Sequence, residues 1–276
     1  MLPKLKHVNV KNEFYNIWRV ENLNYITHIH EELEMVYISQ GQLEVTIEDT
    51  EYLLRAGDIC FAGSMQVHKY HSLAYSKCLM IGASPSVVTL CQDARKDFQL
   101  ECPVIRKAQY SPEMAALFEL LLESTDLIQN PGTCIGLINA IFEYLWGVSH
   151  QVPRPETLAP VKKVLMYLHQ NCFRPITLLT AAEALEMPQY QLSRLCNQQI
   201  GMGFNAYLKF LRITAAKRLL VSTDWAMPDI STQCGFESIR TFNRAFKEMT
   251  NGLSPSDYRN RQAGISFFQM NTDDKY

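Results

Sequence analysis

The sequence contains no long apolar run. No stretch of its 276 residues approaches the roughly 18 consecutive apolar residues that a membrane-spanning helix requires. Residues 1–20 also lack the apolar segment of a secretory signal peptide. These absences argue against membrane insertion and against export, so we expect a cytoplasmic protein without a membrane partner.

Paired cysteines of the kind that bind zinc are also missing. The eight cysteines are scattered, none of them in a Cys-x-x-Cys pair, and several fall at apolar positions of predicted elements. Cysteine is among the residue types most often found buried. We therefore expect reduced core cysteines rather than disulfides or a zinc–thiolate site.

There is little net charge, but the charge is unevenly distributed. The formal net charge is −2. Over residues 160–262, 13 Lys and Arg stand against 7 Asp and Glu, a balance of +6, whereas the remainder has 13 against 21, a balance of −8. A basic segment suits contact with phosphate.

The chain is 276 residues long and 47% of its residues are apolar. A chain of this size and composition can form two hydrophobic cores, so we predict two domains.

The basic segment contains a predicted helix-turn-helix unit near its end. Residues 229–233 predict a short helix, residues 234–236 a turn, and residues 238–249 a longer helix that Ser238 can cap. Gly235 supplies the positive φ that such a turn needs. The longer helix has an apolar stripe at i, i+3, i+4 and i+7, formed by Phe242, Ala245, Phe246 and Met249.

A second unit of the same layout precedes it. Residues 178–185 predict the supporting helix and residues 188–200 the second helix, with Pro188 in its first turn and Gly201 at its end. Residues 204–221, between the units, predict one uninterrupted helix of roughly 27 Å. Such a spacer could hold two helices in successive major grooves on one side of a DNA duplex.

The outward faces of the two second helices carry side chains suited to DNA. Arg can bridge guanine O6 and N7, and Asn can bridge adenine N6 and N7. A solvated polar face is the ordinary explanation for one such helix, but two similar stripes in a basic segment favour DNA contact. The candidate DNA-contacting residues are Gln189, Tyr190, Ser193, Arg194 and Asn197 in the first unit, and Ile239, Arg240, Asn243, Arg244 and Lys247 in the second.

A specific set of residues in this segment matches a family pattern. It consists of Ile230, Cys234-Gly235-Phe236-Glu237-Ser238, Thr241-Phe242, Arg244, Phe246-Lys247 and Ser254-Pro255-Ser256-Asp257-Tyr258-Arg259. The segment thereby resembles the DNA-binding domain of the AraC/XylS family of bacterial transcription regulators. The resemblance implies a regulator, usually an activator, that binds promoter DNA and works with RNA polymerase. Ser231, Pro188 and the extra residue at Asn251-Gly252 depart from the pattern, outside the candidate contact faces.

The N-terminal part is rich in short predicted strands. They cover residues 34–39, 43–48, 51–54 and 59–62, separated by turns at Gly41-Gln42, 49–50 and 56–58. This density of strands and turns suggests a small barrel or sandwich. Two helices follow, one beginning at Ser111 and one over residues 134–148, with a break at 130–132. They either pack on the barrel or form the family's usual dimerisation element.

Three histidines and a glutamate in this part form a recognisable pattern. His28, His30 and Glu34 share parity on an extended segment, and His68 follows Gly57 by eleven residues. The pattern resembles the two cupin motifs, whose three His and one Glu hold a transition metal. Gly63, Met65 and Ser72 depart from the second motif.

Three interpretations of these four residues stay open. They line an effector pocket, which is our prediction, or they are buried side chains satisfied by hydrogen bonds, or His28, His30, Glu34 and His68 are metal ligands. We expect neither a bound metal nor another cofactor.

The sequence as a whole predicts an α+β protein of two domains. Residues 1–150 form a cupin-like β-barrel with a helical pair, which senses the effector and dimerises. Residues 151–160, with closely spaced prolines, form a linker. Residues 161–262 form an all-α domain with tandem helix-turn-helix units, and 263–276 a tail.

The predicted function is that of a sequence-specific transcription regulator, an activator, rather than an enzyme. Its expected partners are double-stranded promoter DNA, a small-molecule effector such as a sugar, RNA polymerase and a second copy of the chain. The alternative is a metal-dependent cupin enzyme tethered to a DNA-binding module.

Overall fold

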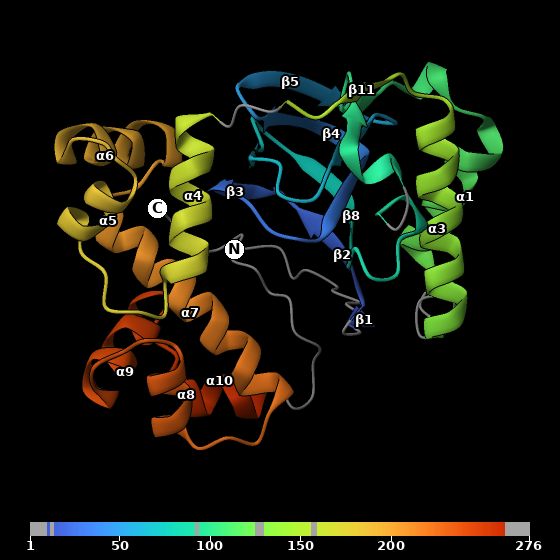
Figure 1. Ribbon diagram of the computed structural model, residues 1–276. Helices are drawn as coiled ribbons and strands as arrows, with labels where there is room; N and C mark the ends of the chain where they lie inside the picture. Colours follow the sequence, from blue (N-terminus) through green and yellow to red (C-terminus); the bar gives the residue numbers. More distant parts are fainter. Residues whose placement is uncertain (1–9, 12–13, 92–93, 125–129, 156–158, 263–276) are drawn as a thin grey trace. The chain divides into compact units, whose positions relative to one another are not determined.

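The computed structural model describes residues 10–11, 14–91, 94–124, 130–155 and 159–262. The chain divides into two compact units, Met1–Glu156 and Thr157–Tyr276. In the described residues the first unit combines a large antiparallel sheet with helices and the second is helical (Figure 1), which confirms the predicted α+β fold class. No helix among these residues is both long and apolar enough to cross a bilayer.

The N-terminal unit is built around one long strand, β4 (Leu33–Ile47). Its first half pairs antiparallel with β6 (Ile59–Ala62) and β8 (Ser76–Ala83), and its second half pairs with β5 (Thr50–Arg55) and β7 (His68–His71). The first half lies in the strand order β1-β2-β8-β4-β6-β10, while β3 pairs with β7 beside the second half. The remaining strands are β1 (Val10–Lys11), β2 (Tyr15–Glu21), β3 (Asn24–His28) and β10 (Val104–Ile105). The two halves of β4 thus belong to two strand layers rather than to one flat sheet.

Two features of this sheet differ from the prediction. The expected turn at Gly41-Gln42 does not separate two strands, because β4 continues through it. Gly41 has φ 77°, and a Cβ there would overlap the carbonyl oxygen of Tyr75, so the strand changes direction at a position that only glycine fits. Strand β2 was not predicted, although it pairs along its whole length with β8.

Side chains alternate along β4 between two cores. Val36 and Ile38 belong to the cluster between the strand layers. Met35 and Tyr37 belong to the other cluster, which includes buried residues of α1 (Pro112–Glu123) and α3 (Pro131–Gly147). Helices α1 and α3 therefore pack on the outer face of the sheet (Figure 1). This was one of the two arrangements expected from the sequence, the other being a dimerisation element.

The start of α3 also needs correction. Asn130 does not merely break the preceding helix, because its side chain accepts a hydrogen bond from the backbone N–H of Thr133 and so caps α3. Pro131 then occupies the first helical position, where its missing N–H has no cost. The helix begins three residues earlier than residue 134 for this local reason.

Short elements complete the unit. They are the 3-10 helices η1 (Thr89–Cys91), η2 (Ala94–Asp97) and η3 (Lys107–Gln109), and the strands β9 (Phe98–Leu100) and β11 (Gln151–Pro153). Strand β11 pairs with β9, and Arg154 donates hydrogen bonds to the carbonyl oxygens of Phe98 and Ser64. The first residues of the predicted linker are thus tied to the N-terminal unit.

The C-terminal unit consists of helices, as predicted. They are α4 (Pro160–Asn171), α5 (Leu178–Ala184), α6 (Gln189–Leu195), the π-helical turn η4 (Cys196–Ile200), α7 (Phe204–Ser222), α8 (Met227–Gln233), α9 (Ile239–Glu248) and α10 (Pro255–Gln262). Pro188 is the N-cap of α6 rather than a first-turn residue, and the predicted helix over 188–200 changes to π geometry at Cys196. Six of the eight cysteines are buried, as expected of core residues.

Candidate DNA interface and effector site

Helix α9 has one apolar and one polar face. The Ser238 hydroxyl caps it by accepting a hydrogen bond from the backbone N–H of Thr241 at 3.2 Å. Phe242 and Phe246 are fully buried and fix the rotation of the helix about its axis. The five candidate contact residues lie on the other face, with Ile239, Arg240, Arg244 and Lys247 exposed and Asn243 half-buried.

Helix α6 presents a similar face. Leu192 and Cys196 are fully buried on one side. The candidate residues Gln189, Tyr190, Arg194 and Asn197 are exposed, Tyr190 at 74%, and Ser193 is half-buried. The Asn197 amide donates to the Ser193 carbonyl oxygen at 2.8 Å, so this N–H is bound within its own helix.

In each helix-turn-helix unit, the turn before the second helix contains a residue with positive φ. In the first unit this residue is Glu186, with φ 51°, and in the second it is Gly235, with φ 76°. A Cβ on Gly235 would lie 2.6 Å from the carbonyl oxygen of Phe173. The second turn therefore requires glycine both for its backbone angle and for close contact, whereas the first does not.

The long helix α7 connects the two helix-turn-helix units. Its 19 residues correspond to roughly 28 Å, with α5 and α6 near its first half and α8, α9 and α10 near its second (Figure 1). Lys209 on α7 forms an ion pair with Glu248 on α9 at 2.8 Å. Arg212 donates to the carbonyl oxygens of Cys172 and Arg174. These contacts brace α7 against the elements on either side.

The basic residues of this unit thus divide into two groups. Arg212 and Arg259 are held by carbonyl oxygens of the protein itself. In the part of the chain that the structure describes, no hydrogen bond or ion pair engages the guanidinium groups of Arg194 and Arg240. These two side chains are therefore available to an external acceptor.

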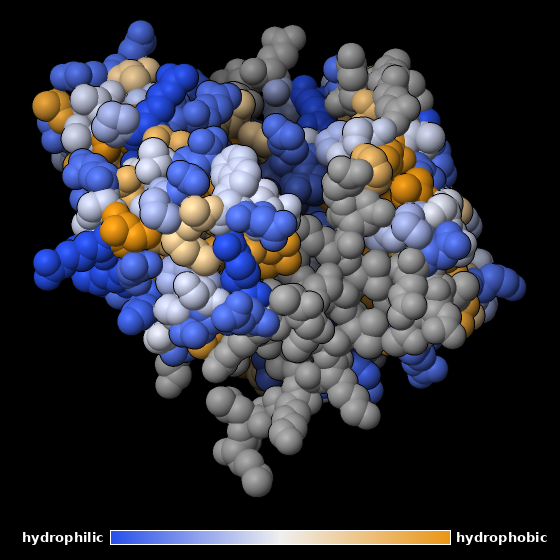
Figure 2. Space-filling model, turned by 90° about the horizontal axis from the view of Figure 1, so that it is seen from below, coloured by the Kyte–Doolittle hydropathy of each residue, from blue (hydrophilic) through white to orange (hydrophobic). Residues whose placement is uncertain are grey.

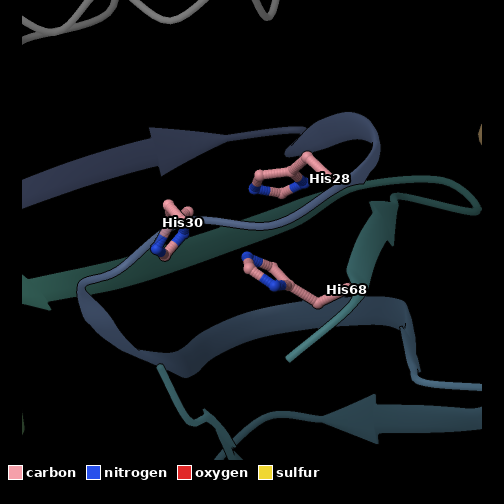
Figure 3. Close-up of side chains that lie close together, drawn as sticks. All are labelled: His28, His30 and His68. Carbon is pink, nitrogen blue, oxygen red and sulfur yellow. The ribbon is translucent and has the colours of Figure 1, made fainter. Parts of the chain in front are cut away.

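In the N-terminal unit the four residues of the cupin-like pattern come together. The prediction that His28, His30 and Glu34 share one extended segment was wrong, because strand β3 ends at His28 and β4 begins only at Leu33. The bend between the two strands places His30 and Glu34 beside His68 of β7. Figure 3 shows the three imidazole rings facing one another, with ring centroids 4.0 Å apart for His28 and His68 and 4.7 Å for His30 and His68.

The Glu34 carboxylate is the anion of this cluster. It is buried, with Oε2 3.5 Å from Nε2 of His30 and Oε1 3.7 Å from Nε2 of His68. The hydroxyl of Tyr70 donates to Oε1 at 2.6 Å. Tyr70 was not identified from the sequence, although it shares parity with His68 on β7 and that alternation could have pointed to it.

The burial of these groups sets their protonation. Burial lowers the pKa of His68 to about 4, with the charge of His30 acting in the same direction. Burial also disfavours the charged forms of His30 and Glu34, but their hydrogen bond and mutual attraction outweigh it, so the pKa of His30 is raised and that of Glu34 is lowered. The cluster therefore holds an ion pair beside a neutral imidazole.

Among the residues that Figure 2 colours by hydropathy, hydrophobic side chains occur in small groups between hydrophilic ones. Exposed large apolar side chains include Leu120 on α1 and Tyr190 on α6. Single exposed apolar residues are normal on protein surfaces.

Two family models match the chain. The model described as an AraC-like ligand binding domain matches residues 11–137, and the model described as a helix-turn-helix domain matches residues 181–261. The first match contains the histidine cluster, and the second contains α6, α7 and α9.

Curated relatives and solved structures match over most of the chain. The HTH-type transcriptional activator RhaR of Yersinia pseudotuberculosis is 22% identical over 256 residues, covering 86% of this chain and 85% of its own length. RhaR of Escherichia coli is 23% identical over 247 residues, covering 84% and 86%. The structure of ToxT from Vibrio cholerae with a bound unsaturated fatty acid has a TM-score of 0.51 at 13% identity, covering 92% of this chain and 98% of that one, a likeness of fold.

Proposed function

Given that the chain belongs to the AraC family of transcription regulators, we propose that the outward faces of α6 and α9 read promoter DNA and that the histidine cluster binds the effector. The protein is a DNA-binding transcription regulator with a ligand-binding domain. Its relatives are regulators and not enzymes, so the cupin enzyme alternative is set aside.

The observation that carries the DNA proposal is the pair of similar polar faces joined by one helix. Arg194 lies on the outward face of α6 and Arg240 on that of α9, and neither has an internal partner among the described residues. An Arg with a free guanidinium suits bidentate contact with guanine. We infer that α6 and α9 enter successive major grooves, with α7 setting their separation.

Selection of binding sites tests this arrangement. Full-length protein is used to recover duplexes from a random pool, and the recovered motif should have two half-sites about 10–10.5 base pairs apart. Arg194→Ala should relax one half-site and Arg240→Ala the other. Lys163→Ala, an exposed change on α4, is the matched control and should leave both half-sites intact. A motif with one half-site, or one that neither arginine variant alters, contradicts the proposal.

The effector proposal rests on the polar character of the cluster. His30, Glu34 and Tyr70 offer hydrogen-bond donors and acceptors beside the apolar cluster between the strand layers, which suits a ligand with hydroxyl groups, such as a sugar, better than an aliphatic chain. The ToxT structure named above holds an unsaturated fatty acid, so fatty acids form the natural counter-panel.

Thermal unfolding separates these ligand classes. A sugar that binds the folded protein should raise its melting temperature, since binding to the native state alone stabilises it. The same sugar should have no effect on a His30→Gln variant. A rise with fatty acids and with no sugar would assign the site to a different ligand class.

The remaining partners follow from family membership and are part of the proposal. Activation, as in the matched relatives, requires contact with RNA polymerase, and the compartment that holds promoter DNA in bacteria is the cytoplasm. We also propose a homodimer formed through the outer side of α1 and α3, where Leu120 is 48% exposed.

A further inference from the structure

We infer that the turn at residues 63–66 couples the histidine cluster to the segment in which the chain leaves the N-terminal unit, and that Arg154 makes this coupling. The turn lies between β6 and β7. Strand β11 and Arg154 come shortly before the second compact unit, which begins at Thr157. The coupling rests on the proposed effector site, because it transmits the occupancy of that site to the linker.

One side of the turn is bonded to residues of the cluster. The backbone N–H of Met65 donates to the carbonyl oxygen of His30 at 2.8 Å. Nδ1 of His68 lies 2.9 Å from the carbonyl oxygen of Gln66, and it donates in this bond because a carbonyl oxygen only accepts. The turn therefore sets the position of the His68 ring and of the His30 backbone (Figure 3).

The other side of the turn is bonded to Arg154 and to β9. Arg154 donates through Nη1 to the Ser64 carbonyl oxygen at 2.9 Å, and through Nε to the Phe98 carbonyl oxygen at 3.1 Å. The side chain of Gln66 donates to that of Gln99 at 3.2 Å. Phe98 and Gln99 belong to β9, which also pairs with β11. The turn, β9 and β11 thus form one continuous hydrogen-bonded group.

The turn has a conformation that its sequence disfavours. Met65 has φ 58°, in the left-handed region where a side chain with a Cβ is strained. The buried Gln66 helps to impose it, because its Oε1 accepts from the backbone N–H of Gly63 at 2.7 Å. Strain of this kind persists only where surrounding contacts hold it, and it is typical of segments that switch between two arrangements. Loss of the Arg154 bond therefore lets the turn relax, and the His68 ring moves with it.

A ligand can distinguish the two arrangements of this segment. In the structure, β11 is paired with β9 and Arg154 holds the turn. In the other arrangement β11 is released and the turn is relaxed. A ligand that contacts His30 and His68 binds the first arrangement more tightly, because only this arrangement holds both residues in place. By linkage, pairing of β11 raises the affinity for the ligand by the same factor by which the ligand favours pairing.

NMR of full-length protein labelled with ¹⁵N-histidine tests the coupling without effector or DNA. The His68 Nδ1–H is hydrogen-bonded and its side chain is 1% exposed, and its resonance is identified by its loss in His68→Gln. Arg154→Gln should shift this resonance and speed exchange of its proton by about tenfold or more, because the turn opens more often. A role of Arg154 in stability alone lowers the melting temperature and leaves the resonance in place.

Arg106→Gln is the matched control for this measurement. Arg106 also donates to a backbone carbonyl oxygen of the N-terminal unit, that of Leu53, which lies outside the turn. The variant should therefore leave the His68 resonance unchanged. An unshifted resonance in folded Arg154→Gln, or an equal shift in Arg106→Gln, would overturn the inference.

Hydrogen exchange measured by mass spectrometry tests the opposite direction. Met65→Gly removes the strain of the positive φ and should slow exchange of the β9 and β11 amides by about threefold or more. Glu186→Gly relieves a similar φ of 51° in the C-terminal unit and should leave these amides unchanged. Unchanged β11 exchange in Met65→Gly would contradict the coupling, and this variant decides if Arg154→Gln does not fold. A screen in which no sugar or fatty acid binds would remove the effector proposal and leave both measurements unaffected.

Discussion

Among single residues, the C-terminal unit separates basic side chains that hold the fold from those that can act outside it. Arg259 donates to the carbonyl oxygens of Leu220 and Trp225, and so links α10 to the end of α7. Arg240 and Lys247 lie on the exposed face of α9. Substitution of these residues should therefore affect different measurements.

Arg240→Ala should weaken binding of a cognate duplex by about 1–3 kcal/mol, with the loss concentrated at one base pair, because it removes a bidentate base contact. Lys247→Ala should weaken all duplexes equally and reduce the slope of log affinity against log salt by about 1, because it removes a phosphate contact. Binding titrations at several salt concentrations give both quantities.

Arg259→Ala is the contrasting variant. It should lower the melting temperature and leave base preference unchanged, since its hydrogen bonds are internal. If Arg240→Ala lowered stability and spared DNA binding, the assignment of α9 as a reading helix would be wrong.

The residues of the histidine cluster were predictable because their spacing is a sequence pattern. His28, His30, Glu34 and His68 could all be named in advance. Tyr70 could not be assigned its role, because its contact with Glu34 depends on how β7 pairs with the second half of β4. Contacts across strands depend on register, which the spacing within one segment does not specify.

Among elements, the helices were predicted more closely than the strands. Helix ends are set by nearby residues, such as the Ser111 and Ser238 caps, and most predicted boundaries in the C-terminal unit agree within two residues. The path of β4 through Gly41 depends on the distant Tyr75 backbone. A local pattern of glycine between two apolar runs therefore predicted a turn where the chain only bends.

The glycines of the C-terminal unit give a paired test of backbone conformation. Gly201→Ala should cost about 1–2 kcal/mol, because φ is 89° there and a Cβ would meet nothing within 4 Å. Gly235→Ala should cost more, because the same backbone penalty is joined by overlap with the Phe173 backbone. Urea unfolding of both full-length variants measures the difference.

Equal losses in the two variants would mean that Phe173 moves away freely. A further loss of site-specific DNA binding in Gly235→Ala alone would show that the turn also sets the position of α9.

The packing of α1 and α3 on the sheet leads to a prediction about the stability of the N-terminal unit. Phe142 on α3 is 1% exposed and packs edge-to-face on Phe61 of β6, with ring centroids 5.3 Å apart. Phe142→Ala should destabilise the protein by about 3–5 kcal/mol, since it leaves a cavity in a closed core. Val148→Ala, an exposed apolar change beyond the end of the same helix, should have little effect by thermal unfolding.

For the whole molecule, the proposed dimer can be tested without DNA. The apolar faces of α1 and α3 are already used by the sheet, so a second copy would have to use side chains such as Leu120. Leu120→Asp should shift the mass measured by light scattering from dimer to monomer and leave the melting temperature of the monomer nearly unchanged. A monomeric wild-type protein would remove dimerisation from the proposal.

The α-helical geometry of α7 has a consequence for the promoters that the protein can recognise. One residue inserted into the middle of this helix would turn everything beyond it by about 100° and advance it by about 1.5 Å. The orientation of α9 in its groove would then no longer match that of α6. Operators should accordingly tolerate a changed base more readily than a base pair added between their two half-sites. Natural variants of the protein should differ in the composition of α7 but keep its length of 19 residues.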